Sequence, residues 1–180
     1  MHNKNGLTSG NNPYSRRDFL KTAGIGAALL SLPSWSSSLL AKQNDTFFRP
    51  YALPPLDEGV RNGNQVSFTL NLKRGSQSFF PGLQTATFGI NQPYSSPVVR
   101  VRKGDEAVFQ VNNQLGEDTA LHWHGLRLPA AMDGGPHQVI AHGDSWLSKF
   151  QIRQAASTCW YHSHQHKRTG PQVYQGMAGM

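Results

Sequence analysis

Apolar and polar residues alternate with a period of two in several short stretches after residue 64. In QVSFTLNL (65–72), every second residue from Val66 to Leu72 is apolar. SWLSKFQI (145–152) repeats the pattern through Trp146, Phe150 and Ile152. A period of two is typical of a strand with one buried face.

Three further stretches also predict strands. SPVVRVRKGDEAVFQVNN (96–113) indicates a strand, a turn at Lys103-Gly104-Asp105 and a second strand. TALHWHG (119–125) predicts a strand ending at Gly125, and STCWYHSH (157–164) is strand-like in its aromatic content. After residue 41 no long stretch has helical periodicity. Short strands separated by turn signals predict an all-β protein, specifically a β-sandwich.

Composition and charge narrow the class of protein. The chain has 180 residues, enough for one domain with a sizeable core, and its 18 glycines and 11 prolines suit a turn-rich β fold. The net charge is +7, and the first 41 residues contribute +3, which leaves +4 for the remainder. These positive residues are scattered, whereas a nucleic-acid-binding surface needs a dense basic face. We therefore expect no nucleic-acid partner.

The N-terminus resembles an export signal. SRRDFLK (15–21) places Arg16 and Arg17 before an apolar run, residues 22–41, that is interrupted by glycine, serine and proline. That run is a poor permanent membrane span. The ordered motif favours a twin-arginine (Tat) signal peptide over residues 1–41, recognised by the Tat export machinery and directing the protein to the periplasm. The alternative is an amphipathic N-terminal helix. Residues 42–64 are predicted to be an extended, proline-rich lead-in to a domain over 65–180.

Two histidine pairs, in LHWHG (121–125) and WYHSH (160–164), are candidate metal ligands. Side chains alternate along a strand, so the two histidines of each pair point the same way, about 6–7 Å apart at the backbone. Trp123 and Tyr161 then face the core. Pairs on neighbouring strands gather four imidazoles, which suit copper or zinc. The alternative is that each is a surface or core histidine. A single-metal His-x-His site is disfavoured because no carboxylate follows Gly125 closely. The four candidates are His122, His124, His162 and His164.

Two segments, residues 121–146 and 158–180, resemble the first cupredoxin domain of a multicopper oxidase of the bacterial laccase and cuprous-oxidase branch. The resemblance covers roughly residues 60–180, and its His-Trp-His-Gly and Tyr-His-Ser-His elements are very specific. It implies a cupredoxin-like Greek-key β-sandwich. It also implies an enzyme that oxidises a reducing substrate (cuprous ion or phenols) one electron at a time and reduces O2 to water with four electrons.

The same resemblance implies roles for the four histidines. His122 would bind the type 2 copper of a trinuclear cluster. His124 and His162 would bind one type 3 copper, and His164 would bind the other. Asp133, in MDGGP, would relay protons during O2 reduction, although Asp-Gly-Gly-Pro is equally typical of a simple turn. His137, His142 and His166 are predicted not to be ligands.

The single cysteine raises a rival interpretation, a small blue-copper electron-transfer protein. Such a site needs a cysteine, two histidines and usually a weak methionine. Cys159 has the wrong strand parity relative to His162 and His164, and the next methionine is Met177. We therefore expect Cys159 to be a small buried core residue.

The resemblance also implies a longer parent protein. The type 1 copper and the remaining ligands would lie in a C-terminal cupredoxin domain, so this chain alone is expected to be inactive as an oxidase. The family also includes a ligand-free branch that acts in cell division. Residues around the second histidine pair resemble that branch, whereas all four histidines favour the copper-binding one.

Overall fold

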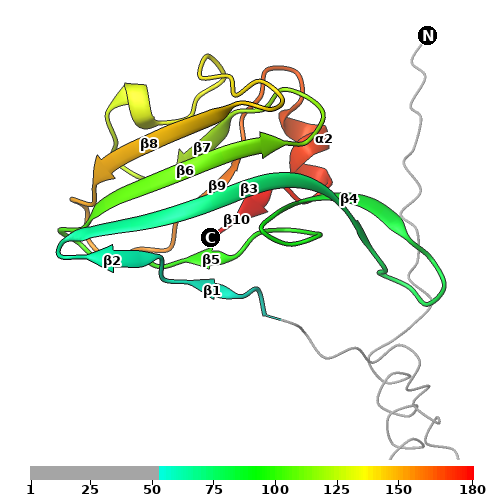
Figure 1. The fold of residues 1–180 in the computed structure, drawn as a ribbon, viewed down its shortest axis with the longest axis horizontal. Coiled ribbons are helices and arrows are strands. Elements are labelled where there is room, and N and C mark those ends of the chain that lie inside the picture. The colour runs from blue at the N-terminus through cyan, green and yellow to red at the C-terminus, as the bar shows by residue number, and fades with distance from the viewer. Residues whose placement is uncertain (1–52) are drawn as a thin grey trace, which may run out of the picture. The chain divides into compact units, whose positions relative to one another are not determined.

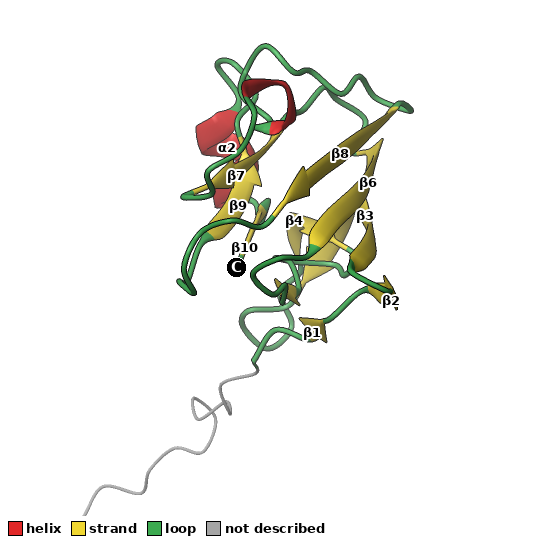
Figure 2. Ribbon diagram, turned by 90° about the vertical axis from the view of Figure 1, so that its left-hand side faces the viewer, coloured by secondary structure: helices red, strands yellow, loops and turns green. Residues whose placement is uncertain are grey.

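The structure, a computed structural model, describes residues 53–180, which form two β-sheets packed face to face (Figures 1 and 2). The larger sheet has the order β2-β3-β6-β8, with β4 also paired to β3, and the smaller has the order β10-β9-β7. Strands β1 and β5 form a separate two-stranded sheet. The predicted all-β, cupredoxin-like sandwich is confirmed.

The elements of this part of the chain follow in sequence order. They are β1 (Leu56–Asp57), β2 (Val60–Asn62), β3 (Gln65–Gln77), β4 (Thr85–Ile90), β5 (Val98–Val99), β6 (Glu106–Gln114), β7 (Leu121–His124), the 3-10 turn η3 (Ala130–Met132), β8 (Ser145–Gln151), β9 (Trp160–Ser163), α2 (Thr169–Tyr174) and β10 (Ala178–Gly179). Strands β3 and β6 are parallel, whereas β6–β8 and β7–β9 are antiparallel. The parallel pair requires a crossover, in keeping with a Greek-key rather than a simple meander.

The period-two pattern of the first predicted strand corresponds to burial in β3. Val66, Phe68, Leu70 and Leu72 are each at most 3% exposed, and the residues between them are more exposed. Their partners on β6 repeat the alternation from Ala107 onward. One face of the larger sheet is therefore continuously apolar, and it packs against the smaller sheet because this removes apolar area from water.

An aromatic cluster joins the two sheets. Trp123 of β7 packs on Phe109 of β6 with ring centroids 4.3 Å apart, and on Phe150 of β8 at 5.9 Å. Its indole nitrogen donates to the Ser148 hydroxyl at 3.1 Å. Trp123 and Tyr161 are both 3% exposed, which confirms that they face the core. His122 and His124 of β7 and His162 of β9 lie on the opposite faces of these strands.

Several elements were not apparent from the sequence pattern. The strands β1, β2, β4 and β10 were not predicted, and neither was α2, a helix of six residues. Within the region predicted to be an extended lead-in, residues 56–57 and 60–62 pair with β5 and β3. These pieces are too short to carry a recognisable period, and tertiary pairing determines them.

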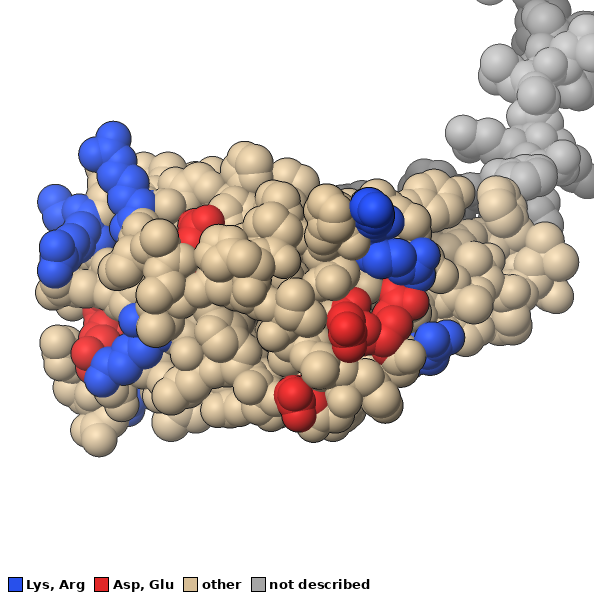
Figure 3. Space-filling model, turned by 90° about the horizontal axis from the view of Figure 1, so that it is seen from above, with Lys and Arg blue, Asp and Glu red and all other residues tan. Residues whose placement is uncertain are grey.

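The predicted signal peptide, residues 1–41, lies outside the described residues. Among the helices in residues 53–180, none is long and apolar enough to cross a membrane. Figure 3 shows one face of the molecule, on which lysine and arginine side chains are interspersed with acidic ones between wide uncharged areas.

Candidate metal centre

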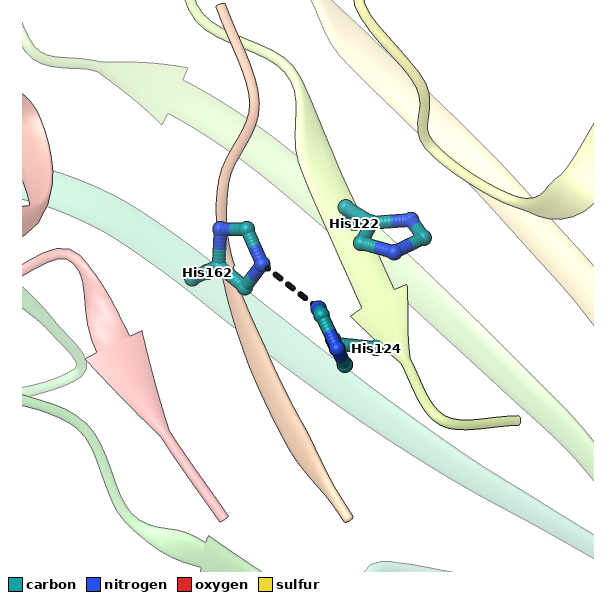
Figure 4. Close-up of side chains that lie close together, drawn as sticks. All are labelled: His122, His124 and His162. Carbon is teal, nitrogen blue, oxygen red and sulfur yellow. Dashed lines mark hydrogen bonds between the residues drawn. The ribbon is translucent and has the colours of Figure 1, made fainter. Parts of the chain in front are cut away.

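The register of β7 and β9 brings the two histidine pairs together. His122 lies directly opposite His162, and His124 lies opposite Trp160. Because Leu121, Trp123, Tyr161 and Ser163 occupy the alternate, buried positions, the histidines project from the outer face of the sheet (Figure 4). One antiparallel pairing thus brings three of the four predicted ligands, His122, His124 and His162, into one group of potential ligands, to which His164 does not belong.

Three of the imidazoles converge closely. Ligand nitrogens of His122, His124 and His162 all lie within 4.8 Å of one another. The shortest separation, 3.3 Å, joins Nδ1 of His124 to Nε2 of His162. The ring of His164 is also near, with its centroid 5.3 Å from that of His122 and 5.9 Å from that of His162.

Backbone carbonyls orient two of these rings. Nδ1 of His122 donates to the Asp133 carbonyl oxygen at 2.8 Å, and Nδ1 of His162 donates to the Ser163 carbonyl oxygen at 2.7 Å. A carbonyl oxygen can only accept, so Nδ1 carries the proton in each neutral ring and Nε2 keeps its lone pair. Fixing the tautomer through the second nitrogen is the usual way in which proteins prepare a metal-binding histidine.

The environment of His162 keeps it neutral. Burial lowers the pKa of His162, and the nearby imidazoles of His122, His124 and His164 lower it further, while the bond to Ser163 acts in the opposite direction. The residue is only 6% exposed. A neutral imidazole is the form that binds a metal ion, because the proton and the ion compete for the same lone pair.

These donors fit a copper ion. Two nitrogens bound to one ion at about 2.0 Å each can be at most about 4 Å apart, and Nδ1 of His124 and Nε2 of His162 satisfy this limit. Since Nε2 of neutral His162 is an acceptor, Nδ1 of His124 must donate in the metal-free protein. An ion between them would replace that single proton. An all-imidazole set is suited to copper or zinc.

Asp133 lies beside the first histidine pair. Its carboxylate Oδ2 is 3.3 Å from Nδ1 of His122, and its carbonyl also accepts from the Trp123 amide at 3.3 Å. The following residue, Gly134, has a φ of +73°, and a Cβ there would lie 1.7 Å from the Leu121 carbonyl oxygen. The MDGGP segment is therefore a turn in close backbone contact with β7, and it also places the Asp133 carboxylate beside His122.

Cys159 lies away from the histidine cluster. Its sulfur is within 3.5 Å of Gln154 Nε2 and of the Ser157 hydroxyl, in the loop before β9. The expectation that Cys159 is a buried core residue is wrong, because β9 begins one residue later and the thiol is only half-buried. It lines an apolar hollow of about 540 Å³ that also contacts Phe109, Trp123 and Met180.

The other histidines of the described chain have separate surroundings. Nδ1 of His142 accepts from the Gly116 amide at 3.0 Å, and the ring of His137 lies beside Gly135. Neither these nor His166 belongs to the group of potential ligands found within residues 53–180.

Sequence reasoning missed three residues around the cluster. Trp160 stacks on His162 with centroids 4.0 Å apart. The Gln138 side chain accepts from the amides of Gly134 and Gly135, and Gln172 is fully buried behind β9. Only Trp160 could have been found from the sequence, because it lies two residues before His162 in the second histidine pair. The glutamines are separated from the histidines they support by turns whose course the sequence pattern does not predict.

Comparison with known proteins gives a consistent family. The family model described as multicopper oxidase matches residues 71–180. The chain is 38% identical over 125 residues to the multicopper oxidase mco of Staphylococcus aureus, covering 69% of this chain and 28% of that protein. It is also 36% identical over 166 residues to the cell division protein FtsP of Escherichia coli, covering 92% of this chain and 33% of FtsP. The chain thus spans about a third of the length of these relatives.

Solved structures that resemble this chain are also multicopper oxidases. The laccase-like multicopper oxidase CueO of Ochrobactrum sp. superimposes with a TM-score of 0.68 at 42% identity, over 72% of this chain and 29% of that one. A multicopper oxidase of Campylobacter jejuni, described as a metallo-oxidase, gives a TM-score of 0.67 at 35% identity, over 72% of this chain and 28% of that one.

Proposed function

We propose that this chain, which belongs to the multicopper oxidase family, is the N-terminal part of an exported enzyme that couples substrate oxidation to the reduction of O2. Four one-electron oxidations, of cuprous ion or of phenols, would provide the electrons. One O2 with four electrons and four protons gives two waters, so the full-length protein needs both an electron entry site and a route for protons. This domain would hold half of the ligands of a trinuclear copper cluster.

The single observation that carries the proposal is the arrangement of His122, His124 and His162. Two of the rings, His122 and His162, are oriented by backbone carbonyls, and Nδ1 of the third, His124, lies 3.3 Å from Nε2 of His162. A purely structural trio of imidazoles would gain little from gathering its ring nitrogens within 4.8 Å of one another. Copper would take the lone pairs of these nitrogens and provide a centre that changes between Cu(I) and Cu(II).

The individual roles follow the family resemblance. His122 would bind the type 2 copper, His124 and His162 one type 3 copper, and His164 the other. Asp133 would pass protons, because its Oδ2 lies 3.3 Å from His122 and its side chain is 37% exposed, between the candidate centre and water. A carboxylate that is partly hydrated and adjacent to a site consuming protons can take them from solvent.

The experiment compares the wild-type chain with His124→Ala and with His142→Ala, a matched control outside the cluster. Copper stoichiometry is measured by metal analysis after gel filtration, and Cu(II) coordination by electron paramagnetic resonance. We expect His124→Ala to lose bound copper while His142→Ala keeps it. In the full-length protein, His124→Ala should also abolish O2 consumption. Equal copper content in all three proteins would overturn the assignment.

A second candidate function, a non-enzymatic role in cell division, is favoured by the similarity to FtsP over 92% of the chain. It requires the fold but no copper. The same copper measurement separates the two functions, because a chain acting only as a cell-division factor has no need to bind the metal stoichiometrically. The oriented histidines support the oxidase.

Export to the periplasm by the twin-arginine route is part of the proposal. It rests on the SRRDFLK motif at residues 15–21 and on the apolar run that follows it. The route carries folded proteins, which suits a domain whose histidines, on β7 and β9, come together only after the sheet has formed.

A further inference from the structure

Gln172, on α2, is a fully buried polar side chain whose hydrogen-bonding capacity is completely used. Its Oε1 accepts from the hydroxyls of Thr119 and Ser163, at 2.8 and 2.5 Å. Its Nε2 donates to the Glu117 carboxylate at 2.7 Å and to the Asp118 carbonyl oxygen at 2.9 Å. A glutamine amide has two acceptor positions and two donor protons, and all four are satisfied here.

These four bonds join the two segments that carry the histidine pairs. Thr119 lies two residues before β7, which bears His122 and His124, and Ser163 lies between His162 and His164. The Glu117 end is fixed in turn by Arg168, whose guanidinium nitrogen donates to both carboxylate oxygens at 2.9 and 2.7 Å. Gln172 is therefore a bridge between the strands, anchored on the third side by α2.

The bridge reaches the candidate metal centre through one residue. The Ser163 hydroxyl donates to Gln172, and the Ser163 carbonyl accepts from Nδ1 of His162 at 2.7 Å. A shift of Ser163 would move the acceptor that orients the His162 ring. The distance between His162 Nε2 and His124 Nδ1 would change with it, because these two atoms are carried by the two bridged strands.

We propose that Gln172 is a positioning residue for the candidate metal centre, setting the separation of the two histidine-bearing strands and the orientation of the His162 ring. The proposal rests on the proposed function for its metal, whereas the ring orientation is a property of the metal-free protein. Groups that orient a ligand from outside the coordination sphere change metal affinity by about 10- to 100-fold when they are removed.

The test compares Gln172→Leu, which keeps a similar volume and removes all four bonds, with Val66→Ala in β3 of the other sheet. Val66→Ala lowers stability through a lost core contact without touching the bridge. Ser163→Ala is a milder variant that removes the bond between Gln172 and β9, together with two longer bonds that the Ser163 hydroxyl accepts from the Thr119 hydroxyl at 3.5 Å and the Gln165 amide at 3.4 Å. It gives the answer if Gln172→Leu does not fold. Two quantities are measured on the 180-residue chain. They are the Cu(I) affinity, by competition with a chromophoric chelator, and the ¹⁵N shifts of the His162 ring without metal.

We expect wild-type His162 to be protonated at Nδ1. Gln172→Leu and Ser163→Ala should bind Cu(I) about tenfold more weakly than Val66→Ala, and their His162 ¹⁵N shifts should move toward a mixture of tautomers. Equal affinity in all variants with unchanged ¹⁵N shifts would overturn the positioning role. If wild type binds no copper but the ¹⁵N shifts still respond to Gln172, the proposed function fails and the positioning of the ring stands.

Discussion

Gly134→Ala should loosen the turn that holds Asp133 against His122. The backbone of Gly134 has a φ of +73°, and an added Cβ would lie 1.7 Å from the Leu121 carbonyl oxygen and 3.0 Å from the Cα of His122. Both neighbours are backbone atoms of β7, so the clash cannot be relieved by rotating a side chain. The turn must move away from the strand.

The magnitude follows from the contacts that are lost. A residue with a Cβ in the left-handed region costs about 1–2 kcal/mol. Moving the turn also weakens two hydrogen bonds to the Asp133 carbonyl, from the Trp123 amide and from Nδ1 of His122, each worth about 0.5–1.5 kcal/mol. We therefore expect the free energy of unfolding to fall by about 3 kcal/mol.

Gly143→Ala is a matched control. Gly143 has a φ of +89°, and an added Cβ would meet no atom within 4 Å. This variant isolates the backbone strain, about 1–2 kcal/mol. The free energy of unfolding of both variants is measured by urea unfolding monitored by tryptophan fluorescence. Copper binding should weaken in Gly134→Ala only, because only that change releases Nδ1 of His122. Equal stability of the two variants, with equal copper affinity, would refute the reasoning.

Three further predictions concern acid stability, proton supply and export. Asp105 is held ionised by Arg61, whose hydrogen bonds lower its pKa from 3.8 to about 2. The folded pKa lies below the unfolded one, so the carboxylate contributes about 2 kcal/mol above pH 4 that is lost as the pH falls toward 2; urea unfolding should show this slope in wild type and much less of it in Asp105→Asn. In the full-length protein, Asp133→Asn should slow O2 reduction with copper content unchanged, whereas loss of stability with intact turnover would leave only the turn role. Replacing Arg16 and Arg17 by lysine should leave unprocessed precursor in cells, and unchanged processing would exclude the twin-arginine route.

The sequence alone determined those features that depend on local periodicity. The alternation from Val66 to Leu72 predicted both the strand and its buried face, because side chains on a strand can face only two ways. The same rule placed Trp123 in the core and His122 and His124 on the opposite face. It needed no knowledge of the partner strand.

Tertiary structure decided which strands meet and in what register. The pairing of His122 with His162 depends on how β7 and β9 align, and a slip of one residue would have turned one pair toward the core. The sequence could not predict this register, since it is fixed by long-range packing of Trp123 against Phe109 of the other sheet.

The supports of the cluster likewise arise only in the folded protein. Gln138 and Gln172 are ordinary polar residues in the sequence, and nothing in their spacing links them to the histidines. Cys159 was expected in the core because its strand was expected to begin earlier, but pairing with β7 starts at Trp160. Periodicity is local and can be read from neighbouring residues, whereas hydrogen-bond partners and strand ends depend on residues that approach one another only when the two sheets pack together.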